Sequence, residues 1–365
     1  MRNYKEIFKQ LIASEVGESN NNKEFIDSLY NKVRDKTLTI ATSLGHKEVD
    51  EHTLKNYFNT AKNEYLSVNP IDPGLSYSLT KKDFKTWLTD ERKNSLKGKW
   101  SYSDRYWDYL EESGRSKKVI EEIKNSSYSI LQKLEDPECK TESYRKGLVV
   151  GAVQSGKTGN FNAVINRAID SGYKLIIVLA GIMEDLRSQT QDRIEKDVIG
   201  EGKLADSEAI GPKGVGHIHR FGVLGESNIQ QVDSATSIKK DFGRIVKDMD
   251  KSLNGRYVLV CKKNVSILRN LIVWLHNSLG EGKNKHNIPF LIIDDEADNA
   301  SLNNLGYKGK NYATKTNEYI RAILNLFYVK SYLGYTATPF ANVLQDRNES
   351  PDMDTVIKYK LNNGE

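Results

Sequence analysis

The residues best suited to chemistry in this chain form a glycine-rich loop. Residues 151–158 read G-A-V-Q-S-G-K-T, which matches the pattern G-x-x-x-x-G-K-T. The glycines allow the backbone to turn so that successive N–H groups point at phosphate oxygens, while the lysine reaches the β- and γ-phosphates and the threonine hydroxyl binds Mg²⁺. The loop therefore predicts a site for ATP and Mg²⁺, with Mg²⁺ on Thr158 and the nucleotide on Gly151, Gln154, Ser155, Gly156, Lys157 and Thr158.

A second group of reactive residues follows a short apolar run. Residues 290–293 read F-L-I-I and are followed by D-D-E-A-D at 294–298. Carboxylates at the C-terminal end of a parallel strand face the crevice in which open α/β sheets bind ligands. We expect Asp295 to hold Mg²⁺ and Glu296 to orient or deprotonate an attacking water. The pattern alone leaves open whether Asp294 or Asp295 is the metal ligand, and the D-E-A-D register favours Asp295.

A third run ends an apolar strand with small hydroxyl residues. Residues 332–340 read Y-L-G-Y-T-A-T-P-F. Thr336 and Thr338 are expected to lie at the same sheet edge, where they would hydrogen-bond the acidic loop and couple the state of the γ-phosphate to motion. The alternative is an ordinary strand end that is stopped by Pro339.

These three motifs, in this order, resemble motifs I, II and III of DEAD-like superfamily-two helicases. The runs at 147–158, 172–191 and 333–342 resemble more closely the helicase-like ATPase region of the Z-one domain endonuclease family, found in bacterial restriction and phage-defence loci. The resemblance covers about residues 107–343. It implies an ATPase core in which ATP hydrolysis drives translocation on DNA or its remodelling.

The resemblance also implies parts for which this sequence offers no match. A superfamily-two motor holds ATP between two RecA-like lobes, and the second lobe supplies arginine side chains worth several orders of magnitude in rate. We recognise neither a second lobe nor a Z-one domain in the 365 residues. We therefore expect weak activity from this chain alone, a second lobe or partner protein that completes the ATPase site, and any nuclease on a partner or a further domain.

Two more polar groups are expected at the ligand edge of the sheet. Arg187, Gln189 and Thr190 follow the second predicted strand, and Lys262 and Lys263 follow the third. Their side chains suit contacts with a nucleic-acid backbone. A solvated helix face or strand end explains the same residues equally well.

Hydrophobic periodicity separates the chain into two predicted domains. Residues 1–140 show helical spacing and end in a polar, proline-containing linker, which predicts an all-helical N-terminal domain. Residues 141–365 alternate strands with helices, which predicts an α/β domain with a RecA-like, parallel, doubly wound sheet. The predicted strands are 147–150, 174–180, 256–261, 289–294 and 331–335, and the predicted helices are 157–170, 184–199, 264–279 and 314–328.

Several weaker features are better explained by structural roles than by functional ones. The glycine-containing segments 200–216 and 303–311 are expected to be insertions or mobile loops. His217 and His219 would share one face of a strand, but no third ligand stands at a metal-binding spacing. The aromatic residues at 100–109 are more typical of a core than of base stacking.

Composition limits the class of protein. The net charge of +5 does not mark a strongly basic nucleic-acid binder, although a basic groove needs only a local patch. The two cysteines, Cys139 and Cys261, form neither a disulfide framework nor a metal pattern, which fits a reducing cytoplasm. No apolar run approaches the ~18 residues that a membrane helix needs.

Two other functions stay open. In the first, ATP gates the assembly of this chain with a partner nuclease and no nucleic acid is moved, which the near-neutral charge favours. In the second, the same loop serves a small-molecule kinase, against which the D-E-A-D and T-A-T-P runs argue.

Overall fold

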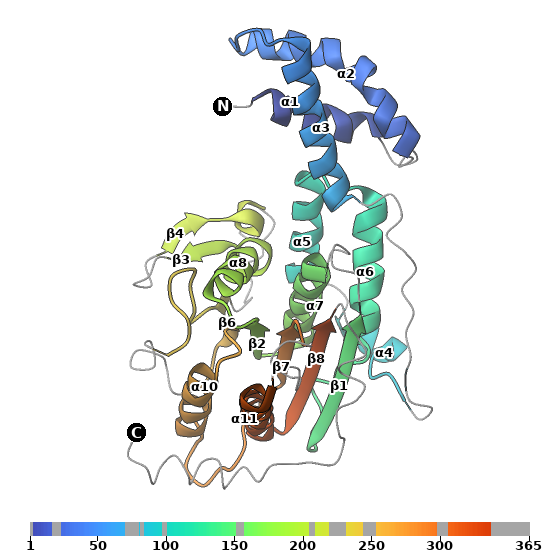
Figure 1. Ribbon diagram of the computed structural model, residues 1–365. Coiled ribbons are helices and arrows are strands. Elements are labelled where there is room, and N and C mark those ends of the chain that lie inside the picture. Colours follow the sequence, from blue (N-terminus) through green and yellow to red (C-terminus); the bar gives the residue numbers. More distant parts are fainter. Residues whose placement is uncertain are drawn as a thin grey trace. The chain divides into compact units, whose positions relative to one another are not determined.

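The structure of the 365-residue chain is a computed structural model, shown in Figure 1. It describes residues 3–16, 23–69, 80, 84–96, 101–150, 157–203, 209–218, 231–243, 253–297 and 306–336. None of the helices within these ranges is long and apolar enough to cross a membrane.

The chain forms two compact units. The first contains residues 1–82 and 107–126, and the second contains 83–106, 127–153 and 157–365. Helices α5 (Ser101–Glu112) and α6 (Lys117–Leu131) each run from one unit into the other. The units therefore do not coincide with the predicted boundary at residue 140, because residues 83–106 and 127–140 belong with the sheet.

The first unit is helical, as its apolar spacing predicts. Its core is built by α1 (Tyr4–Val16), α2 (Lys23–Ser43) and α3 (Glu51–Val68). Phe8 and Phe58 meet edge to face in this core, with ring centroids 5.5 Å apart. Helix α3 is capped by Asp50, whose side chain accepts a hydrogen bond from the Thr53 backbone N–H.

The second unit is built on a six-stranded, all-parallel sheet with the order β1-β8-β7-β2-β6-β5 (Figure 1). The strands are β1 (Ser143–Val150), β2 (Leu175–Ala180), β5 (Val232–Asp233), β6 (Arg256–Cys261), β7 (Phe290–Asp295) and β8 (Val329–Thr336). All predicted strands are present, and each ends within one residue of its predicted C-terminal end. The short β5 is an addition that the sequence did not indicate.

Helices cover both faces of this sheet, so the fold is a mixed α/β fold. On one face Ile176 and Val178 of β2 pack in a core with Phe161 of helix α7 (Lys157–Ser171). On the other face Ile177 and Leu179 of β2 pack in a core with helices α10 (Val265–Asn277) and α11 (Gly306–Asn325). Strand β2 is apolar throughout because it is buried on both faces. The helices of this unit include α4 (Asp90–Leu96), α7 (Lys157–Ser171), α8 (Glu184–Ile194), α10 (Val265–Asn277) and α11 (Gly306–Asn325).

Three expectations need correction in the second unit. The predicted helix 184–199 is α-helical to Ile194 and π-helical over Glu195–Ile199, and it stops at Gly200, whose φ is 86°. The segment 200–216, expected as an insertion or a mobile loop, contains the antiparallel pair β3 (Glu201–Lys203) and β4 (Ala209–Pro212) and the 3₁₀ helix Gly214–His217, so it is not simply a loop. The same expectation was made for 303–311, but α11 already begins at Gly306.

The weaker sequence features, the histidine pair and the aromatic residues at 100–109, have structural explanations where they are described. His217 ends the 3₁₀ helix rather than lying in a strand, and His219 lies outside the described residues. Tyr102 is buried and its hydroxyl accepts a hydrogen bond from the Val232 N–H at 3.0 Å, so this aromatic residue is a core contact.

Candidate functional site

The carboxyl ends of the central strands meet at one edge of the sheet. The register pairs Val150 of β1 with Thr336 of β8, and Ala180 of β2 with Asp295 of β7. Strand β8 lies between β1 and β7, so only one strand separates the end of the phosphate-loop strand from the acidic residues. The strands that carry or precede the three predicted motifs therefore end at this one edge.

The glycine-rich loop has the strand and the helix that its motif requires on either side. Strand β1 ends at Val150, and α7 begins at Lys157. Gly151, Gln154, Ser155 and Gly156 lie outside the described residues. The backbone of Lys157 and Thr158 forms the first turn of α7, where unpaired N–H groups and the helix dipole favour an anion.

Helix α7 is fixed to the strand that carries the third motif. The Tyr335 hydroxyl donates to Asn160 Oδ1 at 2.8 Å, and the Tyr335 ring meets Phe161 edge to face at 5.8 Å. Tyr335 and Phe161 are both fully buried. These contacts join the start of α7 to the end of β8. Thr336 is buried at the last position of β8, and Thr338 lies outside the described residues.

Asp294 is enclosed by protein. Its carboxyl oxygens contact one buried and one partly buried side chain: Lys263 Nζ lies 2.8 Å from Oδ1, and the Tyr332 hydroxyl donates to Oδ2 at 2.6 Å. The exposed fraction of the Asp294 side chain is 0%. This enclosure leaves Asp295 as the carboxylate of the pair that is available to a metal ion.

Asp295 is half-buried at the tip of β7. Burial raises the pKa of this carboxyl, the neighbouring charge of Glu296 raises it further, and the charge of Lys263 lowers it. A divalent cation favours the ionised form of such a carboxyl, and Mg²⁺ prefers oxygen ligands. The position and chemistry of Asp295 therefore fit a metal ligand.

Glu296 adopts a backbone conformation that side chains rarely take. Its φ is 55°, in the left-handed region. The strained residue is held from both sides, because Asp295 Oδ1 accepts from the Glu296 N–H at 3.1 Å and the Ala297 N–H donates to Tyr335 O at 2.8 Å. Strain of this kind concentrates at functional sites. We call residues 294–297 the acidic turn.

The carboxylate of Glu296 lies beside the end of β2. A Cβ placed on Gly181 would lie 3.5 Å from Glu296 Oε2 and 3.1 Å from Leu186 Cδ1. The φ of Gly181 is 36°, which also disfavours a side chain. A larger residue at this position would crowd Leu186 and the Glu296 carboxylate.

Lys263 corrects one of the predicted nucleic-acid contacts. Its side chain is only 1% exposed. Besides the Asp294 carboxylate, its Nζ donates to the carbonyl oxygens of Asp295 at 2.7 Å and Glu296 at 2.6 Å. The side chain therefore belongs to the acidic turn. The signal that could have found it is its place directly after a buried strand next to another lysine, since alternation points one of the two inward.

Arg187 and Thr190 are corrections of the same kind. Arg187 is fully buried, pairs with Glu184 at 2.6 Å, and donates to the carbonyl oxygens of Ser237 at 2.9 Å and Ile238 at 2.7 Å. The Thr190 hydroxyl donates to Leu186 O, one turn back in α8, at 2.9 Å. The polar groups of Arg187 and Thr190 are therefore bonded within the protein and are not presented at the surface for a nucleic acid.

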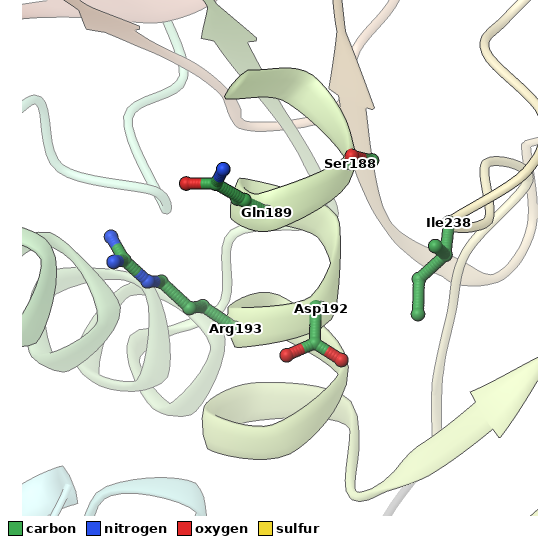
Figure 2. Close-up of a pocket in the computed structure, with 5 residues that line it drawn as sticks. All are labelled: Ser188, Gln189, Asp192, Arg193 and Ile238. Carbon is green, nitrogen blue, oxygen red and sulfur yellow. The ribbon is translucent and has the colours of Figure 1, made fainter. Parts of the chain in front are cut away.

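The other two predicted contacts differ in exposure. Lys262 is half-buried and pairs with Glu184 at 2.6 Å. Gln189 is exposed and lines an open pocket of about 400 Å³ with Ser188, Asp192, Arg193 and Ile238 (Figure 2). In Figure 2 the side chains of Gln189 and Arg193 project from the same side of α8. None of the residues of the acidic turn lines this pocket.

Comparisons of the chain with protein-family models, curated proteins and solved structures find no match.

Proposed function

We propose that this chain is a P-loop ATPase module of the superfamily-two, helicase-like type, with a RecA-like sheet. In this proposal ATP hydrolysis is coupled to translocation on DNA, or to its remodelling, within a restriction or phage-defence system. One observation carries the proposal: β7, which leads into the acidic turn, and β1, which precedes the glycine-rich loop in sequence, end at the same sheet edge, with β8, the strand of the third motif, between them. Helices on both faces of an all-parallel sheet are compatible with a RecA-like lobe.

The proposed roles follow from the surroundings of each residue. Lys157 and Thr158, in the first turn of α7, would bind the phosphates, and Thr158 and Asp295 would hold Mg²⁺. When bound, Mg²⁺ neutralises charge that develops on the phosphate oxygens. Glu296 would orient the attacking water and accept its proton. Its carboxylate lies beside Gly181, at the C-terminal end of β2.

A direct test is phosphate release from ATP by the full chain with and without double-stranded DNA. We expect slow, Mg²⁺-dependent release that DNA accelerates, and its loss in Lys157→Ala, because the lysine supplies the charge that meets the phosphates. A Lys174→Ala variant, changed at a half-buried lysine before β2, is the matched control and should hydrolyse like the wild type. If no nucleic acid changed the rate of phosphate release, the proposed coupling of ATP hydrolysis to movement on DNA would be contradicted.

A second function is favoured by a specific observation. The side chains of Arg187, Thr190 and Lys263, which were expected to face a nucleic acid, are buried instead. This favours a module in which ATP gates assembly with a partner protein. ATP-dependent association without DNA, measured by sedimentation, would support this module over the motor.

A further inference from the structure

The ammonium group of Lys263 is buried against the acidic turn. Its Nζ donates hydrogen bonds to the Asp295 carbonyl at 2.7 Å and the Glu296 carbonyl at 2.6 Å, and it forms an ion pair with Asp294 Oδ1 at 2.8 Å. Burying a lysine is costly unless the charge is paired and hydrogen-bonded. The acidic turn supplies both the paired charge and the hydrogen bonds, which indicates that the lysine organises this turn.

The backbone of Lys263 is hydrogen-bonded to the residue that follows β2. The Lys263 N–H donates to the Gly181 carbonyl at 2.8 Å. Gly181 is the residue beside which the Glu296 carboxylate lies. Lys263 therefore joins three strand ends, those of β6, β2 and β7, around one glutamate.

We propose that Lys263 is a positioning residue for ATP hydrolysis: its buried ammonium holds the backbone of Asp295 and Glu296 so that their carboxylates keep the geometry that turnover requires. This inference rests on the proposed ATPase function. It assigns Lys263 no contact with nucleotide or nucleic acid. The left-handed backbone of Glu296, with φ of 55°, is a conformation that needs such external support.

A simpler role for Lys263 is to neutralise the buried Asp294 carboxylate. The two roles differ in what happens when both charges are removed. If neutralisation is the whole role, a Lys263→Met/Asp294→Asn double variant recovers turnover. If the lysine positions the acidic turn through the two carbonyls, the double variant recovers stability, because no unpaired charge remains, but not turnover.

The experiment measures single-turnover phosphate release, affinity for a fluorescent ATP analogue, thermal unfolding and hydrogen exchange of the Ala297 amide. The last two use nucleotide-free protein. The variants are Lys263→Met, the double variant and Lys330→Met. Lys330 is a matched control, since it is a buried lysine on the N-terminal half of β8 whose Nζ contacts Glu142 at 2.9 Å and the Phe327 carbonyl at 3.1 Å.

The proposal predicts that Lys263→Met releases phosphate about 10- to 100-fold more slowly, while affinity for the analogue stays within about threefold. The Ala297 amide should exchange faster in Lys263→Met and in the double variant, and the double variant should unfold near the wild-type temperature. Lys330→Met should unfold at a lower temperature with unchanged turnover. If Lys263→Met does not fold, the double variant carries the same test.

Two results would overturn the inference alone: wild-type turnover in Lys263→Met, or recovery of turnover in the double variant. A wild-type chain that neither binds nor hydrolyses ATP would overturn the proposed function and the inference with it. The wild-type measurement therefore distinguishes the two failures.

Discussion

At the scale of residues, Asp294 and Asp295 are neighbours with different surroundings. Asp294 is closed in by Lys263 and Tyr332, whereas Asp295 is half-buried at the strand tip. The spacing of D-D-E-A-D left open which carboxylate would meet a metal. Alternation along β7 separates the two, since successive side chains of a strand face opposite sides.

This difference predicts opposite outcomes for two conservative variants. Asp295→Asn should lose Mg²⁺-dependent ATP binding with little change in stability, because it removes a half-buried ligand. Asp294→Asn should keep that binding but lose about 3 to 5 kcal/mol of stability, because the Lys263 ammonium is left buried without a carboxylate. Thermal unfolding and Mg²⁺ titrations with a fluorescent ATP analogue check both. Equal effects of the two variants would contradict the assignment.

At the scale of elements, α7 supports α5 through one carboxylate. Asp170, near the end of α7, accepts hydrogen bonds from the N–H groups of Tyr102 and Ser103 at 2.9 Å each and from the Ser103 hydroxyl at 2.7 Å. These donors lie in the first turn of α5, where N–H groups lack helical partners. The capping residue lies 68 residues along the chain from Tyr102 and 67 from Ser103, so no local sequence motif could have predicted it.

The cap predicts a pH dependence. Burial raises the pKa of Asp170 to about 7 against the bonds from Ser103 and Tyr102, which lower it. The folded protein therefore binds a proton that the unfolded chain has lost above about pH 4, so this group makes the free energy of unfolding fall as pH rises from about 4 to 7. Asp170→Asn cannot ionise, so urea titrations should show the wild type losing stability relative to it over this range. A difference between the two proteins that does not change with pH would contradict the prediction.

At the scale of the whole molecule, the strands and their order along the chain were predictable, but the partners of buried charges were not. Each predicted strand ended within one residue of the observed end because the apolar run stops where polar residues begin at the sheet edge, as at Asp294 and Lys262. Lys263 and Arg187 were placed on the surface because charged residues are usually exposed. Their buried partners come from other strands and from residues 237–238, which sequence spacing does not reveal.

The same reason explains the misplaced boundary between the two units. Helices α5 and α6 show ordinary helical spacing, which says nothing about which core each end joins. Tyr102 and Leu131 pack in the core of the sheet, whereas α1 to α3 have a core of their own. Tertiary contacts rather than composition decide the division.

Single-turnover ATP hydrolysis by Glu296→Gln, with ATP affinity measured on the same samples, decides whether this sheet edge is an ATPase site. We expect the affinity to stay within about threefold of the wild type while hydrolysis slows by about 100-fold or more, because the variant keeps the shape of the side chain and loses the group that accepts the proton. Glu281→Gln, changed at an exposed glutamate, should match the wild type in both. Hydrolysis by Glu296→Gln at the wild-type rate would contradict the claim that this sheet edge is an ATPase site.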